Sequence, residues 1–511
     1  MRIAVVGAGS SGLVTLKYLL DAYPAAAVTC FEKGHSVRGC WGDQRADFVS
    51  TSTKYTTQFS CFRQWQPEVA PEPDFTEFYR GGEFGDYLDA FADHFDLRKC
   101  IRFGVALQRL ERVTNGWRLH LAENGADATQ VFDAVFLCTG LVNKKIPVAS
   151  AVPIAEHLEA IRNKTVVVVG GGESATDIAN HLAKPDYGNT VFLSLRSGVR
   201  VSPRYHPIRG VPSDFLRNRL LMSFSKNLRN WVGERFVTFR IRFDRFLAGV
   251  FPHRNHPSNP DRQAQALRRE WDLKLKARAK GELFNVFHNK SDDFLEAVAE
   301  RRLTLIGPPT DNQWNEYFDF DHTATRRVAP DVLVPSTGYQ SGLADLSSGA
   351  VHLKDFYHGC VHVDKDNLFL IGFARPIIGN IPSISEMQAR YAVGVLAGNY
   401  KLPENVQAKH EDARRALRRE YPSLDTDNVY PVEQFPYCDV LAREMGVMPS
   451  RARLPFTVWM KIMLAPASTT HYLDDYFDGQ MLERQKVYTP TALVILMVLV
   501  RSLSLLRPGR A

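Results

Sequence analysis

RIAVVGAGSSG, residues 2–12, carries the strongest indication of the fold of this chain. Its first five residues are a short apolar run of the kind that forms a buried strand. Gly7, Gly9 and Gly12 then follow in a G-x-G-x-x-G arrangement, and a helical pattern begins at Leu13. The first glycine permits a tight turn, the second lets a pyrophosphate approach the backbone, and the third lets the helix pack closely on the strand. The stretch therefore predicts a dinucleotide site with the phosphates at the start of the helix.

A spaced acid strengthens this prediction. The second strand is expected at Ala27 to Phe31, and Glu32 closes it, twenty residues after Gly12. A carboxylate in this position binds the ribose hydroxyls of an adenosine. The expected contacts of this first cofactor are Gly7, Gly9, Ser10, Ser11, Gly12, Leu13 and Glu32.

A second copy of the pattern lies further along the chain. Thr165 to Val169 (TVVVV) is a buried strand, and GGGESA follows it at 170–175 with alanine in the permitted third position. After the next strand, Val191 to Leu195, Arg196 stands where the first site has Glu32. An arginine there suits a 2′-phosphate and indicates NADP, and the alternative is an ordinary solvated arginine. The expected contacts are Gly170, Gly172, Ser174, Ala175, Leu195, Arg196 and Ser197.

Two dinucleotide sites in one chain indicate a flavin dinucleotide, a nicotinamide dinucleotide and hydride transfer between them. The related segments DAVFLCTG (133–140) and DVLVPSTG (331–338) fall where the chain is expected to leave the first domain and return to it. Thr139 and Gly140 are therefore expected beside the flavin cofactor, unless both segments are ordinary strand-to-turn junctions.

The predicted fold is α/β, with two Rossmann-like dinucleotide-binding domains, the NADP domain inserted in the FAD domain, and a helical basic insertion. The expected domains are 1–149 and 331–450 for FAD, 150–330 for NADP with the insertion at 205–285, and a C-terminal segment at 451–511.

Composition limits the class of protein. With 511 residues, 45% hydrophobic and 23% charged, the chain is neither disordered nor collagen-like. Seven scattered cysteines without a C-x-x-C pair exclude zinc ribbons and disulfide scaffolds, suggest a reducing compartment and indicate no metal site.

The positive charge of the chain is concentrated in one stretch. Residues 196–245 include twelve Lys or Arg and three acids, a net charge of +9, whereas the whole chain has +7. No nucleic-acid motif accompanies this charge, so nucleic acid is not an expected partner.

Two segments have features of membrane-interface helices. Leu220, Phe224, Leu228 and Trp231 have helical spacing among basic residues, whereas 239–243 (FRIRF) alternates. A charged helix is expected at 261–282. Such a basic, apolar segment either lies at a membrane surface or packs on the enzyme with a solvated face.

The second segment is the nine-residue apolar run ALVILMVLV, 492–500, which is too short to span a bilayer. It predicts peripheral or monotopic attachment on the cytoplasmic side of the endoplasmic reticulum or another membrane. The alternatives are that the tail packs on the protein or forms a homodimer contact. In either case the enzyme would be cytoplasmic.

Several segments in order resemble flavin-containing monooxygenases of the class that oxygenates soft nitrogen and sulfur atoms. Phe31 to Trp41 (FEKGHSVRGCW) resembles the FEK…GG-x-W stretch of that family, and Val49 to Phe62 (VSTSTKYTTQFSCF) resembles its NTSKE…FSDF segment. The Thr-Gly segments resemble its linkers, and Asn367 to Arg390 resembles its IGF…E-x-Q-A-R stretch. The resemblance implies that Cys40 and Trp41 lie near FAD.

The chain departs from the family at several positions. Thr51 stands in place of the family's asparagine near the reactive carbon of the flavin, and Cys40 stands in place of a glycine. Of the F-x-G-x-x-x-H signature only His157 remains, and 205–282 shows little similarity. Thr51 and Ser52 are the residues expected to face the flavin ring; the alternative is that they only cap a loop.

The resemblance implies an FAD- and NADPH-dependent monooxygenase. It would transfer one oxygen atom of O2 through a flavin 4a-hydroperoxide to an amine nitrogen or a thioether sulfur. Two alternatives stay open: Baeyer–Villiger oxygenation of a ketone, and an NADPH oxidase that releases hydrogen peroxide, which the loss of the asparagine at Thr51 favours. A cofactor-binding protein without turnover is disfavoured by the two intact glycine patterns.

Overall fold

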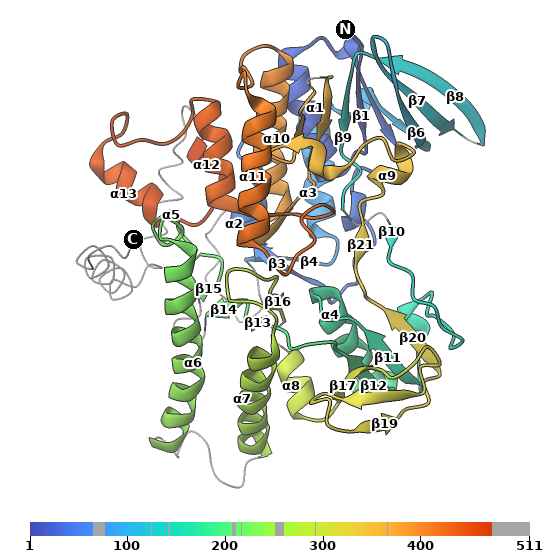
Figure 1. The fold of residues 1–511 in the computed structure, drawn as a ribbon, viewed down its shortest axis with the longest axis vertical. Helices are drawn as coiled ribbons and strands as arrows, with labels where there is room; N and C mark the ends of the chain where they lie inside the picture. Colours follow the sequence, from blue (N-terminus) through green and yellow to red (C-terminus); the bar gives the residue numbers. More distant parts are fainter. Residues whose placement is uncertain are drawn as a thin grey trace. The chain divides into compact units, whose positions relative to one another are not determined.

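The computed structural model describes residues 1–472 except 65–76, 124, 142–143, 207–210, 216, 251–259, 292 and 365. The chain forms two compact units (Figure 1). Unit 1 contains Met1–Leu141, Tyr205–Ser225 and the described residues from Ser341 onward, and unit 2 contains Val142–Arg204 and Lys226–Gln340.

Unit 1 is built on a mostly parallel sheet with the strand order β22-β23-β24-β9-β1-β2-β5. Strands β24, β9, β1, β2 and β5 run parallel, and β22 and β23 pair antiparallel at one edge. The strands are β1 (Ile3–Val6), β2 (Val28–Glu32), β5 (Ile101–Phe103), β9 (Ala134–Leu137), β22 (Phe356–Tyr357), β23 (Val361–His362) and β24 (Leu368–Leu370).

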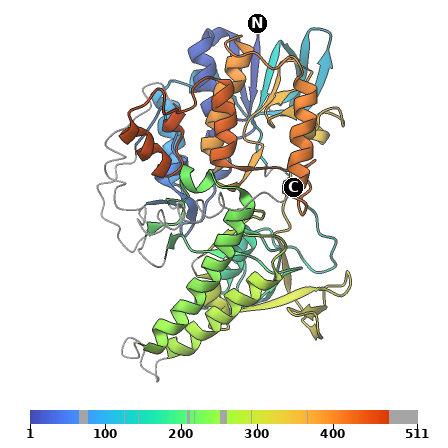
Figure 2. The same cartoon turned by 60° about the vertical axis from the view of Figure 1, so that its left-hand side comes forward.

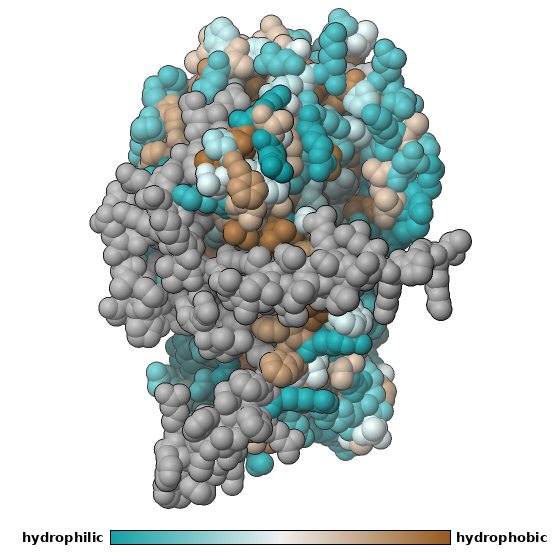
Figure 3. Space-filling view, turned by 90° about the vertical axis from the view of Figure 1, so that its left-hand side faces the viewer, coloured by the Kyte–Doolittle hydropathy of each residue, from teal (hydrophilic) through white to brown (hydrophobic). Residues whose placement is uncertain are grey.

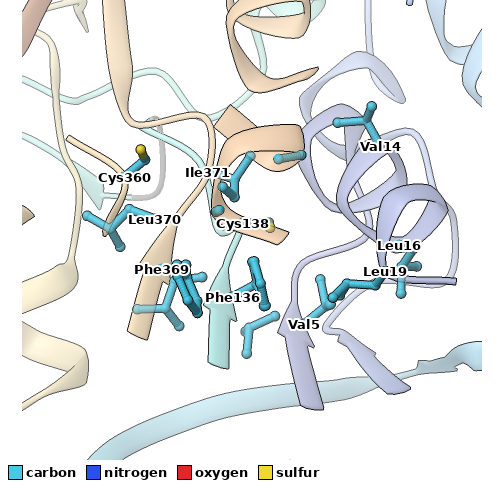
Figure 4. Packing of buried hydrophobic residues seen from close by; sticks show 14 of the residues in the cluster. Val5, Val14, Leu16, Leu19, Phe136, Cys138, Cys360, Phe369, Leu370 and Ile371 are labelled. Atoms are coloured by element: carbon cyan, nitrogen blue, oxygen red, sulfur yellow. The ribbon is translucent and has the colours of Figure 1, made fainter. Parts of the chain in front are cut away.

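The core of unit 1 lies between this sheet and its helices. In Figure 4, Val5 of β1 and Phe136 of β9 lie near the α1 side chains Leu16 and Leu19. Phe136 stacks on Phe369 of β24, with ring centroids 4.5 Å apart. Helix α1 (Ser10–Ala22) lies beside α10 (Ile381–Leu396), as Figures 1 and 2 both show. The first dinucleotide fold therefore combines chain segments that are more than 300 residues apart.

The remaining elements of unit 1 surround this layer. The helices are α2 (Lys54–Thr57), α3 (Glu83–His94), α5 (Arg219–Met222), α9 (Leu343–Leu346), α11 (Val406–Glu420), α12 (Gln434–Glu444) and α13 (Phe456–Leu464). The strands are β3 (Val49–Thr53), β4 (Phe78–Arg80), β6 (Val105–Val113), β7 (Gly116–Glu123), β8 (Ala126–Phe132), β14 (Tyr205–His206), β15 (Val211–Pro212), β25 (Ala374–Ile378) and β26 (Tyr430–Glu433).

Unit 2 has its own sheet, in the order β19-β18-β17-β12-β11-β20, of which β17, β12, β11 and β20 are parallel. The apolar run TVVVV forms β11 between β12 and β20, because β-branched residues suit a strand covered on both faces. The strands are β11 (Thr165–Val169), β12 (Thr190–Ser194), β17 (Leu303–Pro309), β18 (Glu316–Asp319), β19 (Thr325–Arg327) and β20 (Val332–Pro335), with the short pairs β10 (Lys144–Lys145) with β21 (Tyr339–Gln340) and β13 (Val201–Ser202) with β16 (Asn289–Lys290).

The helices of unit 2 include a long antiparallel pair. Helices α6 (Lys226–Val250) and α7 (Pro260–Arg278) lie side by side in Figures 1 and 2. Residues 239–243, whose polar and apolar residues alternate, lie within α6, so alternation does not produce a strand here. The other helices are α4 (Glu173–Leu182) and α8 (Phe294–Ala299).

The basic insertion is divided between the units. Residues 205–285 were predicted to form one insertion in the second domain, but Tyr205–Ser225 belongs to unit 1. The physical reason is α5, which contacts α12 and α13 and whose Arg219 forms a salt bridge with Asp439.

The predicted interface run 492–500 lies outside the described residues. Among the described helices, none combines the length and the apolar composition that crossing a bilayer requires.

Candidate cofactor sites and active site

The loop after β1 is packed so tightly that two of its glycines cannot be replaced without rearrangement. Gly7 has φ +98°, and a Cβ on it would lie 2.7 Å from the carbonyl oxygen of Cys138. A Cβ on Gly12 would lie 1.8 Å from the carbonyl oxygen of Gly7. The loop therefore lies directly against β9 and the first turn of α1.

Gly9 differs from these two, because a Cβ there would meet only the Cα of Gly39, at 3.4 Å. Gly9 is also the N-cap of α1 and offers no side-chain cap, so the first-turn N–H groups of Ser10 and Ser11 are presented at a helix start. Leu13 is fully buried, and its N–H donates to the carbonyl of Gly9. The free N–H groups at the start of a helix bind anions, and a glycine at the N-cap has no side chain to block a pyrophosphate. The start of α1 therefore fits a pyrophosphate.

Glu32 lies at the end of β2, beside the same loop. Its carboxylate accepts hydrogen bonds from the N–H of Ala8 and the N–H of Gly34, both at 2.7 Å. A carboxylate has about four acceptor positions, so capacity remains for the two hydroxyls of a ribose. The geometry of Glu32 therefore fits an adenosine-containing cofactor.

The other residues expected near this cofactor lie on two neighbouring segments. Cys40 and Trp41 belong to a short 3₁₀ turn, Gly39–Trp41, in which Cys40 is exposed and Trp41 packs on Phe84 with ring centroids 4.8 Å apart. Thr139 follows β9; its Oγ1 is buried and has no hydrogen-bond partner in the described part of the chain. A Cβ on Gly140, which has φ +80°, would meet no atom within 4 Å. An unpaired hydroxyl beside open space fits a bound ligand.

Thr51 and Ser52, expected to face the flavin ring, lie half-buried on β3. The loop-capping role falls to Thr53, whose side chain accepts the N–H of Thr56 at the start of α2. Asp214, which the sequence did not indicate, accepts the N–H and Oγ1 of Thr53 and the Oγ1 of Thr56 on its Oδ2, each at 2.9 Å. Asp214 thus positions the end of β3 from a segment about 160 residues away.

A second missed carboxylate supports the other end of this segment. Glu386 of α10 is fully buried and accepts hydrogen bonds from the N–H of Ser60, its Oγ, and the hydroxyl of Tyr18. Burial, and next the charge of Glu386, raise the pKa of Tyr18 well above its usual value. The E-x-Q-A-R stretch could have identified Glu386 as a candidate from the sequence, since Glu386 is its first residue. No comparable pattern marks Asp214.

In unit 2, the loop after β11 repeats the arrangement of the first site. Gly170 has φ +140°, and a Cβ on it would lie 2.2 Å from the carbonyl oxygen of Ser336. A Cβ on Gly172, by contrast, would meet nothing within 4 Å. Ala175 is fully buried, Ser174 is exposed on the first turn of α4, and Gly172 leaves that helix start without a side-chain cap.

The residues expected to read the 2′-phosphate follow β12. Leu195 is buried in the core of unit 2, Ser197 is half-buried, and Arg196 is exposed. Arg196 forms no ion pair with any residue that the structure describes, so its guanidinium is available to a phosphate. These features fit an NADP site.

Residues 1–271, more than half of the chain, match the model of the family described as flavin-binding monooxygenase-like. The chain belongs to this family. Flavin-containing monooxygenase 1 of Mus musculus is 26% identical over 92% of this chain and 88% of its own length. Dimethylaniline monooxygenase [N-oxide-forming] 2 of Rattus norvegicus is 28% identical over the same shares.

Solved structures of flavin monooxygenases share the fold. S-allyl-L-cysteine S-oxygenase from Allium sativum has a TM-score of 0.54 at 17% identity, over 95% of this chain and 97% of its own. The open crystal structure of cyclohexanone monooxygenase has a TM-score of 0.58 at 17% identity, over 86% and 97%. Two Rossmann-like dinucleotide-binding domains are common to this fold. Membership of the flavin-binding monooxygenase-like family makes the chain a flavin-dependent NADPH monooxygenase that uses FAD and NADPH.

Proposed function

We propose that this flavin-binding monooxygenase-like enzyme oxygenates a soft nucleophile, an amine nitrogen or a thioether sulfur. The similarity to mammalian flavin-containing monooxygenases over 92% of the chain carries the proposal, and one such relative is named as N-oxide-forming. FAD reduced by NADPH supplies the activation of O2 when it is bound. The chain's part is to hold the cofactors, orient the substrate and exclude water.

Two groups of residues would hold the cofactors. The loop Gly7–Gly12, Glu32 and Thr139 would bind FAD, with Trp41 and Gly140 beside it. The α4 start with Gly172, and Arg196 after β12, would bind NADPH. Thr51 and Ser52 would face the substrate side of the flavin, in a backbone position that Asp214 holds through Thr53.

Two other reactions remain candidates for specific reasons. Baeyer–Villiger oxygenation is supported by the fold shared with cyclohexanone monooxygenase. Release of hydrogen peroxide is supported by Thr51, which replaces the asparagine that the family has near the reactive carbon of the flavin. A threonine hydroxyl reaches less far toward the flavin than an asparagine amide. The deciding experiment follows NADPH oxidation with an amine, a thioether and a ketone, and measures oxygenated product and peroxide together. Product from the ketone alone, or peroxide equal to NADPH in every case, would contradict the proposal.

Thr51→Asn sharpens this test. If Thr51 faces the flavin, an amide in that position adds a second donor and a longer reach, so peroxide per NADPH falls and oxygenated product rises. Unchanged peroxide in a folded, FAD-containing variant would show that residue 51 does not face the reacting atoms.

We also propose that the enzyme attaches peripherally to a membrane through its C-terminal segment, with a homodimer contact as the alternative role of that segment. The run 492–500 supports this, together with an apolar helix that precedes it, α13.

A further inference from the structure

Unit 1 contains a group of buried polar atoms that lack partners. Within the described residues, no hydrogen-bond partner exists for Nε and Nη2 of Arg63, Oγ1 of Thr469, or either ring nitrogen of His471. Thr469 is completely buried and His471 is 3% exposed. Buried polar atoms in folded proteins are normally hydrogen-bonded, so a group of five requires an explanation.

Arg63 lies beside the segment that carries Thr469 and His471. Arg63 Nη1 lies 3.4 Å from the hydroxyl of Ser468, the residue before Thr469, and the carbonyl of Ser468 accepts the N–H of His471. On another side, Phe435 stacks on His471 with ring centroids 5.9 Å apart, and the guanidinium of Arg219 lies 4.8 Å from the centre of the Phe435 ring.

The charge of this cluster is unbalanced. Arg219 forms a salt bridge with Asp439 and donates a hydrogen bond to the hydroxyl of Tyr472. Among the described residues Arg63 forms no ion pair, and its hydrogen bonds to them are long ones, at 3.4 Å, to the Gln58 carbonyl and Ser468. Burial, and next the charges of Arg219 and Arg63, lower the pKa of His471 well below its usual value. His471 is therefore neutral and can donate one N–H.

A guanidinium whose Nε and Nη2 are buried, and which has no counter-ion among the described residues, is unfavourable for the folded state. Its planar donor set matches a carboxylate, and the hydroxyl of Thr469 and the N–H of His471 are further donors. Arg63 directly follows the segment Val49 to Phe62, and its guanidinium lies 4.9 Å from the ring of Tyr55, on the helix that begins two residues after Ser52. A ligand bound by Arg63 would therefore be held by a residue that lies close in sequence to Thr51 and Ser52, which are expected at the flavin.

We propose that Arg63, Thr469 and His471 form a binding site for a carboxylate, and that this carboxylate belongs to the substrate, which rests on the proposed oxygenation of amines or thioethers. The substrate class is then an amine or thioether that carries a carboxylate. The carboxylate would neutralise Arg63 and complete the hydrogen bonds of Thr469 and His471.

The test uses the full-length, FAD-loaded enzyme and two thioethers of equal length, methylthiopropionate and methylthiopropanol. Calorimetry measures their affinities, and NADPH oxidation with sulfoxide formation measures their use. The acid should bind at least about tenfold more tightly than the alcohol, since one charge-assisted contact has about this effect. Arg63→Met should remove this preference and leave the affinity for the alcohol unchanged.

Arg414→Met is the matched control. Arg414 is a buried arginine of unit 1, whereas Arg63 is partly exposed, and Arg414 has partners, the Thr426 carbonyl and Asp427. This variant should keep the preference for the acid and should unfold at a lower temperature than the wild type. Arg63→Met should unfold at the same or a higher temperature, because it removes an unpaired buried charge.

Three results would overturn the carboxylate site: equal affinities for acid and alcohol, equal losses of both in Arg63→Met, or a loss of thermal stability in Arg63→Met as large as in Arg414→Met. Failure of the proposed function is distinguishable from these. If the acid binds through Arg63 but no thioether or amine is oxygenated, the carboxylate site stands and the substrate assignment is wrong.

Discussion

At the scale of single residues, Gly9 and Gly12 differ in what an added methyl group would meet. In Gly9→Ala the methyl contacts only Gly39 among the described residues, at 3.4 Å, and it would stand where we expect the pyrophosphate to approach the backbone. We predict a folded protein with little bound FAD, measured as flavin absorbance per protein beside a thermal unfolding curve. Gly12→Ala is the control: its methyl would lie 1.8 Å from a carbonyl oxygen, so stability and FAD should both fall. Full FAD content in Gly9→Ala would count against the first site.

Arg196 allows a second prediction at this scale. Arg196 follows Leu195, and its side chain is exposed and forms no ion pair with a described residue. Its removal should therefore leave the fold intact. If it pairs with the 2′-phosphate, Arg196→Ala raises the KM for NADPH by about tenfold or more, because such charge-assisted hydrogen bonds contribute about 1.5–3 kcal/mol each. The KM for NADH is the internal control and should hardly change. Equal changes for both cofactors would show that Arg196 does not bind the phosphate.

Residues that act locally could be predicted from the sequence, whereas residues that act across the fold could not. Gly7, Gly12 and Gly170 were identifiable because their roles depend on a short turn between a strand and a helix. Asp214 and Arg63 were not, because their significance depends on partners that are distant in the chain or absent from it. A lone aspartate or arginine carries no spacing that indicates such a role.

At the scale of elements, buried strands were the most predictable feature. TVVVV forms β11 at the expected residues, because an uninterrupted β-branched run has few alternatives. The helical spacing from Leu220 to Trp231 was less reliable: the chain forms α5 and α6 there, separated at residues 223–225. The periodicity is real within each piece, but tertiary contacts of Arg219 and Asn218 with the C-terminal part of unit 1 interrupt the helix.

Glu444, the last residue of α12, connects three elements of unit 1. Its carboxylate accepts hydrogen bonds from the hydroxyl of Tyr357 at 2.7 Å, from His358 Nε2 at 2.9 Å, and from the hydroxyl of Tyr391. Burial by itself raises the pKa of Glu444, but His358 and the two tyrosines outweigh burial and lower the pKa from 4.5 to about 2. A depressed carboxyl pKa stabilises the fold above the unfolded-state value, and this stabilisation is lost as the pH falls through the folded-state value.

We therefore predict that Glu444→Gln is less stable than the wild type at neutral pH, by at most about 3.5 kcal/mol, since one pKa unit corresponds to about 1.4 kcal/mol. The difference should shrink as the pH falls from 4.5 toward 2. Urea unfolding midpoints over this range measure it, with the exposed Glu404→Gln as the control that should match the wild type. Parallel stability curves for wild type and Glu444→Gln would rule out this network as a source of acid sensitivity.

At the scale of the whole molecule, the two units are interleaved along the chain. Unit 1 is assembled from an N-terminal piece, the short piece Tyr205–Ser225 and the C-terminal part, and unit 2 from the two pieces between them. The paired Thr-Gly segments indicated such an insertion, because each resembles an exit from a parallel strand. They could not indicate that Tyr205–Ser225 belongs to unit 1, since that piece is held by contacts with distant residues, such as Arg219 with Asp439 and Asp214 with Thr53.

An apolar surface precedes the C-terminal segment. Helix α13 has the sequence FTVWMKIML; Phe456 is 57% exposed, stacks on Trp459 and lies near the guanidinium of Arg451. Figure 3 shows the face of the molecule on which hydrophobic residues of this region gather among hydrophilic ones. Exposed aromatic side chains beside arginines are typical of helices that lie in a membrane interface.

The membrane proposal is tested by removing the run that suggested it. Nine apolar residues followed by Arg501, Arg507 and Arg510 are too few to span a bilayer but match a helix attracted to anionic lipid. We predict that the full-length enzyme sediments with membranes and that deletion of 490–511 moves it to the soluble fraction. Bound FAD should be retained, because both glycine loops lie in the first 175 residues. If the full-length enzyme is already in the soluble fraction without detergent, the segment instead packs on the protein or joins two copies, and analytical ultracentrifugation of both forms distinguishes these roles.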